Sequence, residues 1–238
     1  MHDTIKLDTA VSIIAHRGLS GLERENTNAA FVAAGNRSYY GIETDIHRTK
    51  DGRFIVFHDD TIERLAGVDG VVEEMTFEEL RQLRLRDMDG NIREDLLLPS
   101  LEEYIRICKK YGKQSILELK NHFEPADIQQ IIAIIQQEGW LEHTTFISFD
   151  LPNVLYVRRL LPEQPVQYLV DEPPENLLET LTENRLDLDI YYRFLNPELV
   201  SACHEAGVLV NTWTVDSVED GLRAAQMGVD YITSNILE

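Results

Sequence analysis

Two carboxylates lie two positions apart in the stretch YGIETDIHRTKDGRFIVFHD, residues 40–59. Glu43 and Asp45 stand among apolar residues, and in a β-strand this spacing places both side chains on one face. Neighbouring carboxylates repel, and each raises the pKa of the other unless a cation offsets them. The pattern predicts a site for Mg²⁺ or Ca²⁺, hard cations that prefer oxygen ligands. The alternative is a sheet edge whose solvent-facing side carries charges.

A histidine follows this acid pair after a predicted turn. Residues 50–52 read Lys-Asp-Gly, and an Asp-Gly pair between extended segments is typical of a tight hairpin. If Asp and Gly form a two-residue loop, Lys50 pairs with Arg53 and His58 lies opposite Asp45, to within about one residue. We therefore expect His58 beside the acids.

Further polar side chains stand at the ends of predicted buried strands. The apolar run Val11–Ala15 ends at His16, which is a candidate acid or base, or else a histidine bonded to a neighbouring loop. A later strand, SILELK, places Glu118 and Lys120 on one face. Because a buried charge needs a partner, these two form either a structural ion pair or part of a site.

The composition excludes several classes of partner. The chain has 238 residues and a formal charge of -20, with a pI near 4.7. This charge opposes binding to nucleic acid or to an anionic membrane surface, so a phosphate-bearing substrate must be attracted locally. We find no signal peptide and no apolar run long enough to span a membrane. Cys108 and Cys203 lack metal-ligand spacing, and we interpret them as reduced thiols of a cytoplasmic protein.

Strand and helix signals alternate along the chain, which predicts a parallel sheet. The expected parallel strands begin near residues 11, 41, 115, 144, 166, 186, 208 and 230. Eight strands is the number that closes a TIM (β/α)8 barrel, an α/β fold. We expect one such domain over residues 1–238. The charge-rich stretch 60–98 interrupts the alternation, and we interpret it as a small insertion or lid after the second strand, without a core of its own.

The barrel prediction places the candidate residues on one face, because active sites of such barrels lie at the C-terminal ends of the strands. These strand ends carry His16, Glu43, Asp45, Glu118, Lys120, Ser148 and Trp213. Trp213 is either an apolar wall for a small substrate or a plug in the mouth of the barrel. The shared face favours a site over independent surface charges.

Several separated motifs resemble one known family. HRGLSGLERENTNAAF, GIETDIHRTKDGRFIVFHD, LELK and NTWTVD are similar in order, spacing and chemistry to the motifs of the glycerophosphodiester phosphodiesterases. The match extends from His16 to Thr233 and implies a TIM barrel with an insertion after the second strand. It also implies metal ligands at Glu43, Asp45 and Glu118, and catalytic histidines at His16 and His58.

The resemblance assigns five more residues. It implies phosphate-contacting cations at Arg17 and Lys120, and a tryptophan near the glycerol pocket at Trp213. Glu25 and Asn26 match the motif that shapes the wall of the site, although Glu25 by its position alone is a solvated loop acid. The implied reaction is metal-dependent hydrolysis of a glycerophosphodiester to glycerol 3-phosphate and an alcohol, with the substrate's 2-hydroxyl as the nucleophile.

The chain departs from the family pattern at three points. Arg24 replaces a usual proline, Asp216 a usual asparagine, and the ending Ile-Thr-Ser-Asn a commoner Thr-Asp. None of these changes removes a proposed ligand or histidine. Two alternatives remain, a phosphodiesterase that acts on lysolipids and a non-catalytic barrel that binds phosphodiesters. The alcohol group and the oligomeric state are not predicted.

Overall fold

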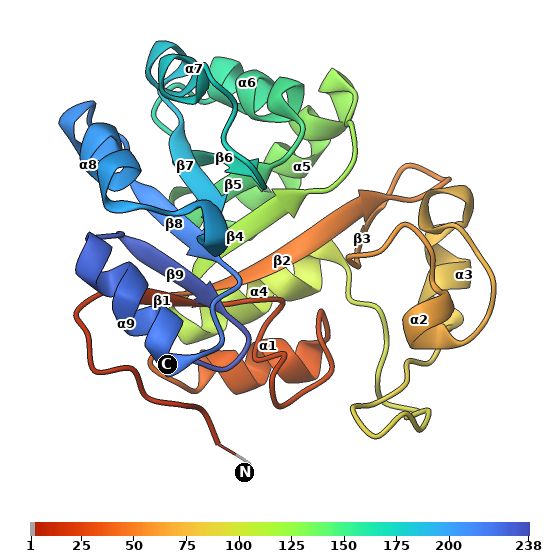
Figure 1. The fold of residues 1–238 in the computed structure, drawn as a ribbon. Coiled ribbons are helices and arrows are strands. Elements are labelled where there is room, and N and C mark those ends of the chain that lie inside the picture. Colours follow the sequence, from red (N-terminus) through yellow and green to blue (C-terminus); the bar gives the residue numbers. More distant parts are fainter. Residues whose placement is uncertain (1–2) are drawn as a thin grey trace.

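The computed structural model describes residues 3–238, and eight of its nine strands form a closed parallel barrel (Figure 1). The strands are β1 Ser12–Ala15, β2 Gly41–Arg48, β3 Phe54–Val56, β4 Gln114–Leu119, β5 Thr144–Ser148, β6 Val166–Val170, β7 Asp187–Tyr191, β8 Val210–Trp213 and β9 Tyr231–Ser234. Pairing runs in the order β1-β9-β8-β7-β6-β5-β4-β2, and a β1–β2 pairing closes the ring. The predicted TIM barrel is confirmed.

Helices surround the strands, as Figure 1 shows. They are α1 Asn28–Gly35, α2 Glu63–Ala66, α3 Phe77–Gln82, α4 Leu101–Tyr111, α5 Pro125–Glu138, α6 Leu151–Leu160, α7 Leu177–Asn184, α8 Pro197–Glu205 and α9 Val218–Met227. Thr76 and Ser100 form the predicted capping boxes, each accepting from the N–H of a Glu three residues on. Within residues 3–238, no helix combines the length and the apolar character needed to cross a bilayer.

The hairpin after β2 differs from the prediction by one residue. Thr49, not Lys50, pairs with Arg53, since the Thr49 N–H donates to the Arg53 carbonyl at 2.8 Å. The loop therefore has three residues and ends at Gly52, whose φ of 75° lies in the left-handed region that glycine adopts readily. The added residue shifts the register, and Phe57 rather than His58 bonds to the backbone of Asp45.

The insertion after β3 packs around a small apolar cluster, which the sequence interpretation did not anticipate. The buried members are Ile55, Phe57, Ile62, Leu65, Ala66, Val72, Phe77, Leu80, Leu85, Leu96 and Leu98. Two of them, Ile55 and Phe57, belong to β3 and the residue after it, so the cluster is continuous with the hairpin arm. In Figure 1 the insertion, with α2 and α3, lies to one side of the barrel. That it acts as a lid within one domain stays a prediction.

The pairing of β2 with β4 positions the central acids. In this parallel register Asp45 is opposite Glu118, and Glu43 is opposite Ile116. Alternation along each strand directs all three carboxylates toward the barrel interior. They therefore lie at the C-terminal end of the barrel, where the loops that follow the strands surround them.

We expect Leu80→Ala to lower the free energy of unfolding by about 2–4 kcal/mol, because it leaves a cavity in the insertion cluster where Leu80 is fully buried. Met88→Ala, in the same insertion but 52% exposed, is the control and should change it by less than about 0.5 kcal/mol. Urea unfolding followed by circular dichroism measures both. Equal effects would contradict a packed cluster.

Candidate active site

Three buried carboxylates form the centre of the site. Ligand oxygens of Glu43, Asp45 and Glu118 all lie within 4.8 Å of one another. Their exposed fractions are only 3%, 1% and 6%. An arrangement of hard oxygen donors with this much negative charge fits a divalent cation, and these three residues could hold one.

The loop after β1 fixes two of these acids. The Arg17 N–H donates to Glu43 Oε2 at 2.7 Å, and the Asn26 side-chain amide donates to Asp45 Oδ2 at 2.7 Å. Thr44 holds the Asn26 amide in this orientation by donating to its oxygen at 2.7 Å. Arg17 and Asn26 both have φ near 55°, a costly region for residues other than glycine. Backbone strain at two predicted site residues thus accompanies the placement of the carboxylates.

Two cations adjoin the acids. Lys120 Nζ lies 2.9 Å from Glu118 Oε1 and 3.6 Å from Asp45 Oδ1. Arg17 Nε lies 3.7 Å from Asp45 Oδ2. Glu118 and Lys120 thus form an ion pair, as one interpretation of the sequence predicted, but this pair adjoins the acid cluster. The same contacts place positive charge where an anion would approach.

Burial and mutual repulsion raise the pKa values of two of these carboxyl groups, whereas the neighbouring cations lower that of the third. Burial and the charge of Asp45 raise the pKa of Glu118 to about 8, and the same causes together with Glu118 raise that of Glu43. Burial opposes ionisation of Asp45 too, but Arg17 and Lys120 outweigh it and hold the pKa of Asp45 low. The metal-free cluster therefore retains protons that a bound cation would displace.

Two linked side chains, Asn235 just after β9 and Asp216, hold His16 in place. Its Nδ1 lies 2.7 Å from Asn235 Oδ1, and Asn235 Nδ2 donates to Asp216 Oδ2 at 2.6 Å. Since the amide is oriented by Asp216, its oxygen accepts from His16, which places the proton on Nδ1 and leaves Nε2 as an acceptor in the neutral ring. Burial, with the charge of Arg17, lowers the pKa of His16 to about 4.

His58 is held through the insertion. Its Nδ1 lies 2.8 Å from Asp59 Oδ1, and Arg64 of α2 donates to both Asp59, at 2.6 Å, and Glu25, at 2.7 Å. Glu25 in turn accepts from Arg17 at 2.9 Å. Glu25 is therefore no solvated loop acid, since these contacts hold its pKa down at about 2 against the effect of burial. Burial also lowers the pKa of His58, aided by the nearby cations.

A pocket with about 350 Å³ of empty space brings most of the predicted residues together. Its lining is His16, Arg17, Glu43, His58, Glu118, Ile147, Phe149, Leu169, Asp189, Trp213 and Thr233. Trp213 forms one wall, with its ring centroid 5.6 Å from that of Phe149 and 5.3 Å from that of Tyr191. The sequence interpretation missed Asp189, which lies on β7 at a position that alternation directs inward, and Phe149, the residue after β5.

Two other polar residues have structural contacts. The Ser148 hydroxyl donates to the Leu119 carbonyl at 2.6 Å, so it binds two strands together instead of facing the pocket. Arg24 donates to the carbonyls of Arg86 and Asp87. The residue that replaces the usual proline therefore ties the β1 loop to the insertion.

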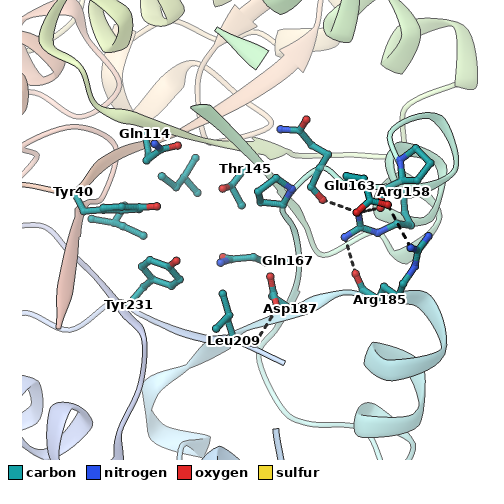
Figure 2. Close-up of a pocket in the computed structure, with 15 residues that line it drawn as sticks. Tyr40, Gln114, Thr145, Arg158, Glu163, Gln167, Arg185, Asp187, Leu209 and Tyr231 are labelled. Carbon is teal, nitrogen blue, oxygen red and sulfur yellow. Dashed lines mark hydrogen bonds and ion pairs between the residues drawn. The ribbon is translucent and has the colours of Figure 1, made fainter. Parts of the chain in front are cut away.

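A wider hollow, of about 940 Å³, lies at the opposite end of the barrel (Figure 2). Its cations are already engaged, because the Arg158 guanidinium donates to the carbonyls of Gln164 and Arg185, and Arg185 lies 3.8 Å from Glu163. The opening is at the N-terminal ends of the strands, away from the acid cluster. We therefore place the active site at the smaller pocket.

Comparison with known proteins identifies the family. The model of the glycerophosphoryl diester phosphodiesterase family matches residues 16–237. The chain belongs to this family. A glycerophosphodiester phosphodiesterase of Caldanaerobacter subterraneus is 31% identical over 229 residues, covering 94% of this chain and 93% of the relative. The resemblance inferred from the motifs is thus confirmed.

Solved structures agree with this assignment. A phosphodiesterase of Oleispira antarctica, in complex with the product sn-glycerol-3-phosphate, is 28% identical with a TM-score of 0.85, covering 94% of this chain and 92% of that one. A glycerophosphodiester phosphodiesterase of Parabacteroides distasonis is 29% identical with a TM-score of 0.80, covering 98% and 94%.

We expect Arg64→Gln to raise the pKa of His58. Without the guanidinium, the full charge of Asp59 acts on the imidazole and stabilises its protonated form. Arg93→Gln is the control, because Arg93 belongs to the same insertion but pairs with Asp87 and Asp95. Titration of the ring by NMR measures the shift, and an unchanged pKa in the Arg64 variant would show that Arg64 does not offset the charge of Asp59 at His58.

We expect the metal-free protein to lose stability between about pH 6.5 and about pH 8. The lowered histidines are neutral in both folded and unfolded states there, whereas folded Glu118, with its pKa near 8, keeps a proton that the unfolded chain releases. Urea unfolding in chelator should show the decline, and Glu118→Gln should reduce it. Parallel curves for wild type and variant would contradict the raised pKa.

Proposed function

We propose that the protein hydrolyses glycerophosphodiesters, such as glycerophosphocholine and glycerophosphoethanolamine, to glycerol 3-phosphate and an alcohol, with Mg²⁺ or Ca²⁺ as cofactor. The observation that carries this proposal is an oxygen-only acid cluster with two cations beside it, next to a pocket that both histidines line. Membership in the phosphodiesterase family supports it, as does the product found in the related Oleispira structure.

In this proposal Glu43, Asp45 and Glu118 hold the divalent cation, which supplies charge stabilisation for the phosphate oxygens in the transition state. Arg17 and Lys120 provide positive charge beside it. They allow a chain with a formal charge of -20 to bind an anionic diester. Asn26 and Glu25 orient these groups, the first through Asp45 and the second through Arg17.

His16 and His58 transfer protons. One accepts the proton of the nucleophile and the other protonates the departing alcohol oxygen, roles suited to imidazoles that are neutral near pH 7. In the first step the glycerol 2-hydroxyl oxygen attacks phosphorus and the alcohol leaves, which gives a cyclic phosphate. In the second, water opens the ring and yields glycerol 3-phosphate. Each histidine is oriented through Nδ1, His16 by Asn235 and His58 by Asp59, which leaves Nε2 for the substrate.

Trp213 forms the apolar wall for the glycerol carbons. We also propose that the protein acts in the cytoplasm on small-molecule substrates of lipid breakdown. Action on lysolipids is the rival within the same chemistry, and a non-catalytic phosphodiester sensor is the rival outside it. The histidine pair favours catalysis, because a binding protein needs no proton donor and acceptor.

The test is release of glycerol 3-phosphate from glycerophosphocholine and glycerophosphoethanolamine, with Mg²⁺, with Ca²⁺ and with chelator. We expect metal-dependent turnover and a loss of at least about 100-fold in kcat for His58→Ala, the usual contribution of a positioned acid or base. His143→Ala, a histidine in the 3-10 helix Leu141–His143 before β5, is the matched control and should keep full activity.

Turnover of lysophosphatidylcholine alone would favour the lysolipid activity instead. Binding without turnover of any of these diesters, unchanged in His16→Ala, would support the sensor.

A further inference from the structure

A buried carboxyl of β7 faces the pocket without a full set of partners. Asp189 is 2% exposed and lines the pocket, and its Oδ1 has no hydrogen-bond partner among residues 3–238. An unsatisfied buried carboxyl oxygen is costly and therefore uncommon in folded proteins. None of the motif assignments gives Asp189 a role.

The neighbours of Asp189 in the sheet do not donate a hydrogen bond to its Oδ1 atom. Its register partners are Leu169 on β6 and Asn211 on β8. Leu169 has no polar side-chain atom, and the Asn211 amide donates to Gln167 at 3.3 Å while its oxygen accepts from Thr233. Burial, and next the charge of Glu118, raise the pKa of Asp189, and Asn211 offsets only part of this.

A second buried polar atom in the same pocket lacks a hydrogen-bond partner within residues 3–238. Trp213 Nε1 is buried and has no acceptor within the described part of the chain. Trp213 thus offers a donor and Asp189 an acceptor, with the apolar side chains of Ile147 and Leu169 in the same lining. A hydroxyl group on a short carbon chain matches this set, because it both donates and accepts hydrogen bonds. It would also pair with Asp189 in either protonation state.

We propose that Asp189 is a specificity-determining residue that binds the distal hydroxyl of the glycerol unit, with Trp213 as its companion donor. This inference rests on the proposed function. Since the 2-hydroxyl is the nucleophile there, the hydroxyl that remains for Asp189 is the one at the far end from the phosphate. In a lysolipid acylated at that position the hydroxyl is an ester, which has no proton to donate to Asp189. Asp189 therefore selects glycerophosphodiesters over such lysolipids.

The experiment compares glycerophosphocholine with the phosphocholine diester of propane-1,2-diol, which keeps the nucleophilic hydroxyl but has a methyl group at the far end. We expect wild type to prefer the glycerol substrate in kcat/KM by at least about tenfold, since the analogue leaves Asp189 without its partner. Asp189→Leu should raise KM for the glycerol substrate and bring the ratio close to one, and Asp189→Asn should retain part of the preference.

Asp187→Leu is the matched control. Asp187 lies two residues earlier on β7 and faces the hollow at the other end of the barrel (Figure 2), so its replacement should leave the ratio unchanged. Melting temperature separates a binding role from a structural one. Removal of an uncompensated buried carboxyl should leave the melting temperature of Asp189→Leu equal to or above that of wild type.

An unchanged substrate ratio in Asp189→Leu, or an equal loss on both substrates with a lower melting temperature, would overturn the proposal. Failure of the proposed function is distinguishable, because wild type would then turn over neither substrate. In that event, calorimetric binding of glycerol 3-phosphate and of propane-1,2-diol 1-phosphate, each with Mg²⁺, decides the role of Asp189. Tighter binding of the first by wild type, lost in Asp189→Leu, supports the proposal, and equal binding contradicts it.

Discussion

Electrostatic repulsion among three buried carboxylates is the constraint that organises this protein. The barrel imposes it, because the parallel register of β2 and β4 places Asp45 opposite Glu118 with Glu43 on the same face. Carboxyl groups this close can all be ionised only if positive charge is supplied. Arg17 and Lys120 supply part of it, while burial and the charge of Asp45 still raise the pKa of Glu118 to about 8. The remaining negative charge favours a divalent cation, which these three carboxylates could hold.

Contacts between segments far apart in the chain stabilise the three carboxylates and the groups around them. The loop after β1 bonds to the acids and adopts strained conformations to do so. The insertion reaches the same charges from the other side, since Arg64 joins Glu25 to the carboxylate that holds His58. Cations are few in this acidic chain, and several of them are concentrated here. An acidic surface thus contains a place where positively charged side chains gather.

The sequence allowed the barrel, the acid cluster and both histidines to be predicted, because strand alternation and a spacing of two are local properties. The predicted hairpin register differs from the observed one by one residue. Two-residue and three-residue loops share the same Asp-Gly signal, and only the Thr49–Arg53 contact distinguishes them. Arg64 and Asp189 could not be assigned. Arg64 donates to Glu25, 39 positions earlier, from a segment with no clear periodicity. Asp189 cannot be told from the many other acidic residues until its burial is known.

Asp216 and Asn235, two positions where the chain departs from its family's pattern, are bonded to each other and through Asn235 to His16. Here an acid stands at the first position and an amide at the second, and the amide donates to the acid. The two positions depend on each other, because exchanging Asp216 for an amide or Asn235 for an acid would leave two like groups in contact. Each of the two positions, taken alone, departs from the family pattern. Together they still form a contact with one donor and one acceptor.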